Sequence, residues 1–152
     1  MENRFENFSI SVMKLNKIVQ RIKLYEMEEY GLRAIHVMCI YYLDRAPWGL
    51  TSGELVKATC EDKAAISRAL GLLRKKGYIE YDSRKYNSPV KITQSGKKVA
   101  DYINERANAA VEAGGDNLTE ARRDAFYETM KRISENLESY YKELRAERKK
   151  SK

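Results

Sequence analysis

Residues 51–93 read TSGELVKATCEDKAAISRALGLLRKKGYIEYDSRKYNSPVKIT, and this stretch decides the fold. Thr51 and Glu54 have the spacing of a capping box, which predicts the start of a short helix. Asp62 is placed to cap a second helix, and Gly77 is suited to the left-handed position that ends it. The segment therefore predicts two helices joined by a tight turn, which is a helix-turn-helix.

Two short alternating segments follow these helices. Residues 78–81 and 90–93 alternate in polarity, so they predict the two strands of a hairpin. The loop between them, residues 83–89, contains Arg84 and Lys85. A helix-turn-helix followed by a hairpin is a winged helix, and winged helices mostly bind duplex DNA.

A helical wheel with Ile66 turned inward assigns the outer face of the second helix. Outward positions are small near the start of the helix and basic toward its end: Ala64, Arg68, Gly71 and Lys75, flanked by Lys63 and Ser67. Small side chains let a helix enter the major groove, where Lys and Arg reach phosphate or guanine edges. The outer face is therefore the predicted DNA-reading surface.

Each of these assignments has a plainer alternative. Arg68 is predicted to contact a base or a phosphate, and the alternative is a surface ion pair with Glu61 or Asp62. Ser67 is equally compatible with a phosphate contact and with a simple surface hydroxyl. The basic run 74–76 could clamp a phosphate, or could simply supply the cations that a helix C-terminus favours.

The charge distribution agrees with a phosphate-binding surface. The chain has 152 residues and a net charge of +7. Residues 51–98 carry +6 and residues 142–152 carry +4, so the rest of the chain is slightly acidic. This is the electrostatic footprint of a DNA-binding module, and a solubilising surface is the alternative.

Amphipathic helices are predicted on both sides of the winged helix, over about 5–29 and from Thr119 onward. Each has an apolar stripe, and a second copy of the chain would bury both stripes. The predicted organisation is a helical dimerisation region (1–30 and 114–146), a winged-helix lobe (31–98), a connecting long helix opened by Ser95 (99–113) and a basic disordered tail (147–152). The fold class is mainly α, or α+β.

Four short elements occur in order: 54–56, 62–68, 73–79 and 92–96. In sequence and spacing they resemble the MarR family of transcription regulators, and the resemblance covers nearly the whole chain. It implies a homodimer that binds double-stranded DNA at a near-palindromic operator, usually as a repressor. It also implies release by a small aromatic or phenolic effector. The chain departs from the family at the wing, where residues 83–87 stand in place of a longer tip with an Asp-x-Arg pattern.

Taken together, the wheel, the charge and the resemblance predict DNA contacts at positions on both helices and on the wing. The resemblance places residues 62–68 at the base edges and the wing cations against the minor groove. The predicted DNA-binding residues are Thr51, Ser52, Lys63, Ala64, Ala65, Ser67, Arg68, Lys75, Arg84, Lys85 and Lys91.

Other classes of function find less support in the sequence. His36 and Cys39 lie three residues apart on an apolar helix, which is too few ligands for a metal site, so we expect a satisfied histidine and a buried thiol. No metal, cofactor or catalytic site is expected, and the chain is not predicted to be an enzyme. With no signal peptide and no membrane span in sight, the expected location is the cytoplasm.

Three alternatives remain open from the sequence alone. Tyr25, Tyr30, Tyr41 and Tyr42 could line an effector pocket, or could pack at an interface. Redox sensing occurs in the MarR family, so Cys39 or Cys60 could act as a sensing thiol. The winged helix could also serve as a protein-interaction module that meets an acidic partner.

Overall fold

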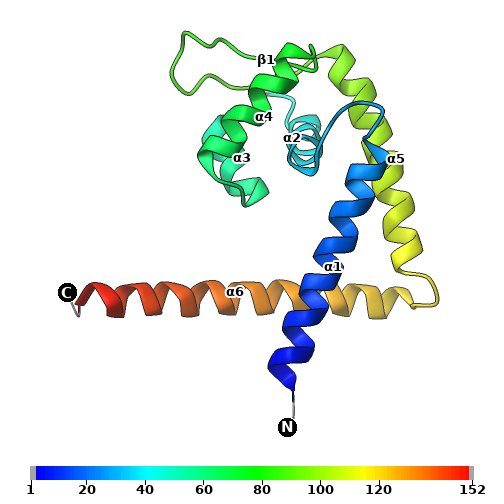
Figure 1. The fold of residues 1–152 in the computed structure, drawn as a ribbon, viewed down its shortest axis with the longest axis vertical. Helices are drawn as coiled ribbons and strands as arrows, with labels where there is room; N and C mark the ends of the chain where they lie inside the picture. Colours follow the sequence, from blue (N-terminus) through cyan, green and yellow to red (C-terminus); the bar gives the residue numbers. More distant parts are fainter. Residues whose placement is uncertain (1–2, 151–152) are drawn as a thin grey trace. The chain divides into compact units, whose positions relative to one another are not determined.

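The computed structural model describes residues 3–150. It is mainly helical with one small antiparallel hairpin (Figure 1), which confirms the predicted fold class. The elements in order are α1 (Arg4–Glu26), α2 (Ala34–Asp44), α3 (Ser52–Thr59), α4 (Lys63–Lys75), β1 (Ile79–Glu80), β2 (Lys91–Ile92), α5 (Gln94–Gly114) and α6 (Glu120–Lys150).

The helix-turn-helix forms from local signals that the sequence shows. Thr51 Oγ1 accepts from the Glu54 N–H at 3.2 Å, and Glu54 Oε2 accepts from the Thr51 N–H at 2.8 Å. Asp62 Oδ1 accepts from the Ala65 N–H at 2.7 Å and so starts α4. Gly77 has a φ of +76° and ends the segment in the left-handed region. The predicted capping box, cap and stop are all confirmed.

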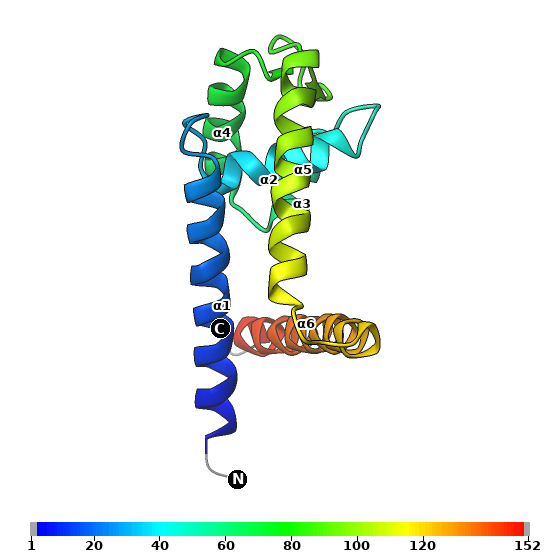
Figure 2. The same cartoon turned by 90° about the vertical axis from the view of Figure 1, so that its right-hand side faces the viewer.

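The hydrophobic core lies between the helices of the winged-helix lobe. Figure 1 shows α2 between α4 and α5, and Figure 2 shows it crossing behind α5. Helix α4 turns Ile66, Leu70 and Leu73 inward, and all three are buried in the same cluster as Leu55 of α3. Each such side chain contributes about 1.5–3 kcal/mol when fully buried. Because its inner face is anchored in this way, α4 keeps a fixed outer face.

The hairpin is shorter than predicted. Its strands are two residues each and pair Ile79 with Ile92 and Glu80 with Lys91. On the opposite edge, Val90 donates its N–H to the Leu50 carbonyl at 2.8 Å and its carbonyl accepts from the Leu50 N–H at 3.0 Å. This isolated bridge, which the sequence did not predict, adds a third segment at the outer edge of the hairpin.

Helix α5 begins one residue earlier than predicted, at Gln94. Thr93, and not Ser95, is the capping residue, because its hydroxyl accepts from the Gly96 N–H at 3.1 Å. The same hydroxyl donates to the carbonyl of Gly77 at 2.6 Å, which ties the start of α5 to the end of the helix-turn-helix.

The chain divides into two compact units, Met1–Asn108 and Ala109–Lys152. Residues 1–30 and 114–146, predicted as one dimerisation region, therefore fall into different units, and their shared role stays a prediction. Residues 147–150, predicted to be disordered, are helical as the last turn of α6. Two parts of these predictions lie outside the described residues: the disorder of residues 151 and 152, and the dimerisation role of residues 1 and 2.

Both terminal helices expose apolar side chains in the single chain. On α1 these include Phe8, Val12, Leu15, Val19 and Ile22, and on α6 they include Phe126, Leu137, Tyr140, Tyr141 and Leu144. Such large exposed apolar faces mark protein interaction surfaces or membrane contacts. Within residues 3–150, however, the helices are all too short or too polar to span a bilayer.

Candidate nucleic-acid interface

The outer face of α4 is the centre of the candidate site. Lys63, Ala64, Ser67, Arg68, Gly71 and Lys75 are all exposed, as the helical wheel predicted. Ala65, also predicted to contact DNA, is half-buried. The helix has no acidic residue between its first and last positions. The side chains on this face are small at the start of the helix and cationic toward its end. Such a face can approach a polyanion closely.

The side chain of Arg68 is available for a partner outside the chain. Among residues 3–150, no ion pair joins it to Glu61 or Asp62, the alternative that the sequence left open. The Asp62 carboxylate accepts a hydrogen bond from the backbone of α4. Arg68 is therefore presented as a free cation at the middle of the exposed face.

At the start of α3, Thr51 and Ser52 are less available than predicted, because both are half-buried. The Thr51 N–H and hydroxyl both donate to Glu54 Oε2 at 2.8 Å. These hydrogen bonds, from the backbone first and the hydroxyl second, hold the pKa of Glu54 below its ordinary value. Thr51 thus acts as a helix cap in this structure, and its polar groups are already occupied.

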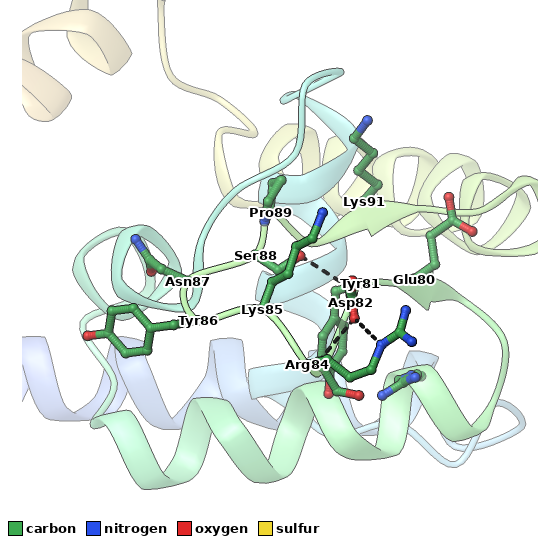
Figure 3. A pocket seen from close by; sticks show the side chains of 12 residues that line it. Glu80, Tyr81, Asp82, Arg84, Lys85, Tyr86, Asn87, Ser88, Pro89 and Lys91 are labelled. Carbon is green, nitrogen blue, oxygen red and sulfur yellow. Dashed lines mark hydrogen bonds and ion pairs between the residues drawn. The ribbon is translucent and has the colours of Figure 1, made fainter.

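The wing is organised around Asp82. Its Oδ1 accepts from the Arg84 N–H at 3.0 Å and from Arg84 Nε at 3.2 Å (Figure 3). Asp82, Ser83 and Arg84 are themselves an Asp-x-Arg sequence, so the predicted loss of that pattern was wrong, while the shorter tip stays a prediction. The Arg84 side chain is 90% exposed even though it is paired. Its guanidinium is held in place and still faces solvent.

Beside the wing lies a basic hollow of about 810 Å³, lined by residues 80–89, Arg74 and Lys91. The guanidinium carbon of Arg74 lies 4.8 Å from the centre of the Tyr81 ring, a cation–π contact. Figure 3 shows Lys85 and Lys91 extending to the same side of the hairpin. Arg74 of α4 thus contacts the wing through Tyr81 and lines the same hollow as the wing cations. The sequence suggested Arg74 only as a phosphate clamp or as a cation at the helix end.

The single histidine and the thiol of Cys39 are buried in the core, whereas the thiol of Cys60 is exposed. His36 is buried, and its Nδ1 accepts from the Arg33 N–H at 2.8 Å, so it is a satisfied core residue as predicted. Burial first and the Glu61 charge second raise the pKa of Cys39 to about 12, so its thiol is protonated at neutral pH. Cys60 is exposed in the turn before α4, with a φ of +58°.

The four tyrosines proposed for an effector pocket occupy different surroundings. Tyr30 packs on Tyr102 with ring centroids 5.3 Å apart. Tyr41 and Tyr42 meet edge to face at 5.6 Å. Tyr25 is exposed to solvent on α1. The contacts of these rings are those of packing, and they do not gather the four side chains around one cavity.

The arrangement of these elements matches solved structures of MarR proteins. A MarR protein from Peptoclostridium difficile has a TM-score of 0.83 and 22% identity over 95% of each chain. The S. aureus MepR–DNA complex has a TM-score of 0.75 and 16% identity, over 85% of this chain and 97% of that one. CouR from Rhodococcus jostii, bound to p-coumaroyl-CoA, has a TM-score of 0.77 and 14% identity, over 88% of this chain and 95% of its own.

Sequence comparison is less informative than structure for this chain. No protein-family model matches it, and no curated protein matches it. At identities between 14% and 22%, the likeness establishes the fold, which is the MarR winged-helix fold; over residues 3–150 it has six helices and one hairpin.

Proposed function

We propose that this chain is a MarR-family transcriptional regulator that binds double-stranded DNA through α4 and the wing. The observation that carries the proposal is the outer face of α4, which is exposed, free of acidic residues and cationic toward its C-terminus. The fold supports it, because the solved structures that share this fold include one in complex with DNA.

In the proposed complex, α4 lies in the major groove. Ala64 and Ser67 allow close approach, and Arg68 reaches a base edge or the adjacent phosphate. Lys75 meets the phosphate backbone at the end of the helix. Arg84 and Lys85 approach the neighbouring minor groove from the wing, and the Asp82 pairing limits the motion of Arg84. Phosphate contacts supply much of the affinity, and the few base contacts supply the specificity.

Replacing single cations separates these two kinds of contact. Arg68→Ala is expected to weaken binding to the selected operator by about 1–3 kcal/mol and to relax base preference at one position. Lys75→Ala should weaken all sequences alike and reduce the salt dependence of binding by about one phosphate contact. Both can be measured by selecting operators from a genomic DNA pool and then titrating them at several salt concentrations. An Arg68→Ala protein with unchanged operator affinity would contradict the assignment of that side chain.

The proposal includes a homodimer that recognises a near-palindrome. Two copies related by a two-fold axis place their α4 helices about one helical turn apart on the duplex. The exposed apolar stripes on α1 and α6 support this assembly, because a second copy would cover them.

A mutation in the α6 stripe tests the dimer. Leu137 is about half exposed in the single chain, so Leu137→Ala should leave the chain folded. We expect the dimer dissociation constant to rise roughly tenfold, as for a contributing interface residue, in sedimentation equilibrium. Ser139→Ala is the matched control, because its hydroxyl bonds only the carbonyl of Glu135 and lies off the stripe. Equal dissociation constants for the two variants would argue against α6 as the interface.

The finer part of the proposal is cytoplasmic repression relieved by a small aromatic ligand. A dimer on an operator blocks transcription, and a ligand that changes the spacing of the two α4 helices releases it. CouR supports the presence of a ligand in this proposal, since its structure holds p-coumaroyl-CoA. A thermal-shift screen of phenolic acids and their thioesters, followed by operator release, tests it. If ligands bind without changing the affinity for operator DNA, the proposed release mechanism is wrong.

A further inference from the structure

Trp48 is the single tryptophan of the chain, and its side chain is 87% exposed. It lies in the turn between α2 and α3, where the Gly49 N–H donates to the carbonyl of Ala46 at 2.8 Å. Tryptophan has the largest apolar area of any side chain and is enriched at interaction sites. One exposed apolar side chain needs no explanation by itself, so a role for Trp48 depends on the residues that surround it.

The turn that carries Trp48 is pressed against the outer strand of the wing. Leu50 and Val90 exchange two backbone hydrogen bonds at 3.0 and 2.8 Å. Gly49 has a φ of +85°, and a Cβ there would lie 2.6 Å from the Val90 carbonyl oxygen and 3.0 Å from Lys91 Cγ. There is no room for a side chain at Gly49. Gly49 therefore lies against Val90 and Lys91, and the exposed indole is carried by the residue just before it, on a turn that has little freedom to move.

Helix α4, the two strands of the hairpin and the turn that carries Trp48 follow one another across the wing. Helix α4 contacts β1, β1 pairs with β2, and the Leu50–Val90 bridge lies beyond β2. Trp48 thus follows at the edge of the wing that is remote from α4. When α4 occupies a major groove and the wing lies in the next minor groove, this edge faces duplex outside the half-site.

We propose that Trp48 and Lys91 form a second contact with double-stranded DNA, on the backbone that flanks the half-site. The Lys91 ammonium would pair with a phosphate, and the indole would pack on the neighbouring deoxyribose. Such a contact carries no sequence information but lengthens the bound segment and adds affinity. The inference rests on the proposed function and extends it to flanking DNA, the occupant that the positive charge of the adjoining wing favours.

The test uses Trp48 as its own probe, because no other tryptophan contributes to the fluorescence. Two duplexes are compared: an operator that ends at the outer edge of its half-sites, and the same operator with about ten further base pairs, or one helical turn, on each side. We expect acrylamide quenching of Trp48 to fall severalfold on the longer duplex and to stay nearly unchanged on the shorter one.

Variants measure what the contact contributes. Trp48→Ala should weaken binding to the longer duplex roughly tenfold, as removal of an aromatic nucleic-acid contact does, and leave the shorter one unaffected. Trp48→Phe, which retains an aromatic face, should recover most of the loss. Circular dichroism confirms that both variants are folded, as expected for so exposed a side chain.

The outcomes separate this inference from the proposed function. Specific operator binding with Trp48 equally quenched on both duplexes overturns the flanking contact and leaves the regulator proposal standing. Absence of any specific operator binding overturns both. Protection of Trp48 that depends on protein concentration and not on DNA would show that a second copy covers the indole, which also overturns the flanking contact.

Discussion

Gly96→Ala is expected to lower the free energy of unfolding by about 3 kcal/mol, the upper range for overpacking a buried site. Gly96 is buried in the first turn of α5, against the start of the hairpin. A Cβ there would clash with the Tyr78 carbonyl oxygen and lie 2.7 Å from Ile92 Cγ1. The Tyr78 carbonyl also accepts from the Thr93 N–H at 3.0 Å, so it has no freedom to retreat. Only a separation of α5 from the hairpin would relieve the clash.

Urea unfolding at fixed protein concentration measures this loss, and thermal unfolding should show a midpoint roughly 6–12 °C lower. Gly53→Ala is the matched control, since nothing lies within 4 Å of a Cβ at that position in α3. It should gain about 0.5–1 kcal/mol, because alanine loses less backbone entropy than glycine in a helix. A Gly96→Ala protein as stable as the control would show that α5 and the hairpin are not in this contact.

The parts of the fold that depend on local chemistry could be predicted from the sequence. Thr51 and Asp62 cap helices because a short polar side chain reaches the backbone N–H three residues ahead. Gly77 ends α4 because a left-handed residue is needed there. The inward face of α4 follows from helical periodicity, and with it the exposed position of Arg68.

Features set by contacts between distant residues could not be predicted. On the outer edge of the hairpin Val90 pairs with Leu50, forty positions earlier, and no sequence periodicity predicts such a bridge. Arg74 contacts the Tyr81 ring as well as solvent. This contact depends on how the hairpin folds back on α4. The Asp-x-Arg sequence that begins at Asp82 is local and could have been predicted, and the ion pair makes its role plain.

The prediction for the end of the chain was wrong for a different reason. Residues 147–150 belong to the tail for which the sequence predicts disorder, as at many chain termini, yet they continue α6. Lysine and arginine are good helix formers, and cations are favourable near a helix C-terminus. A basic run after a long helix therefore predicts continuation of the helix as readily as fraying.

Gly71→Glu is expected to lower operator affinity roughly 100-fold while leaving the chain at least as stable as before. Gly71 is exposed on the outer face of α4, between Arg68 and Lys75, and nothing lies within 4 Å of a Cβ there. Alanine or glutamate in its place gains up to about 1 kcal/mol in helix propensity, and a glutamate also pairs favourably with Lys75 four positions on. The same carboxylate would face the phosphates of a bound duplex, where like charges repel.

The two readouts of this variant therefore move in opposite directions, which separates a folding defect from a binding defect. Gly71→Ala serves as the matched control: it has the same helix gain without the charge, and it is small enough for the groove. We expect raised stability and nearly unchanged affinity for Gly71→Ala, and raised stability with lost affinity for Gly71→Glu, in urea unfolding and operator titration. If Gly71→Glu binds operator as well as Gly71→Ala does, the outer face of α4 is not turned toward DNA, because a carboxylate at the centre of a protein–DNA contact has no means of avoiding the phosphates.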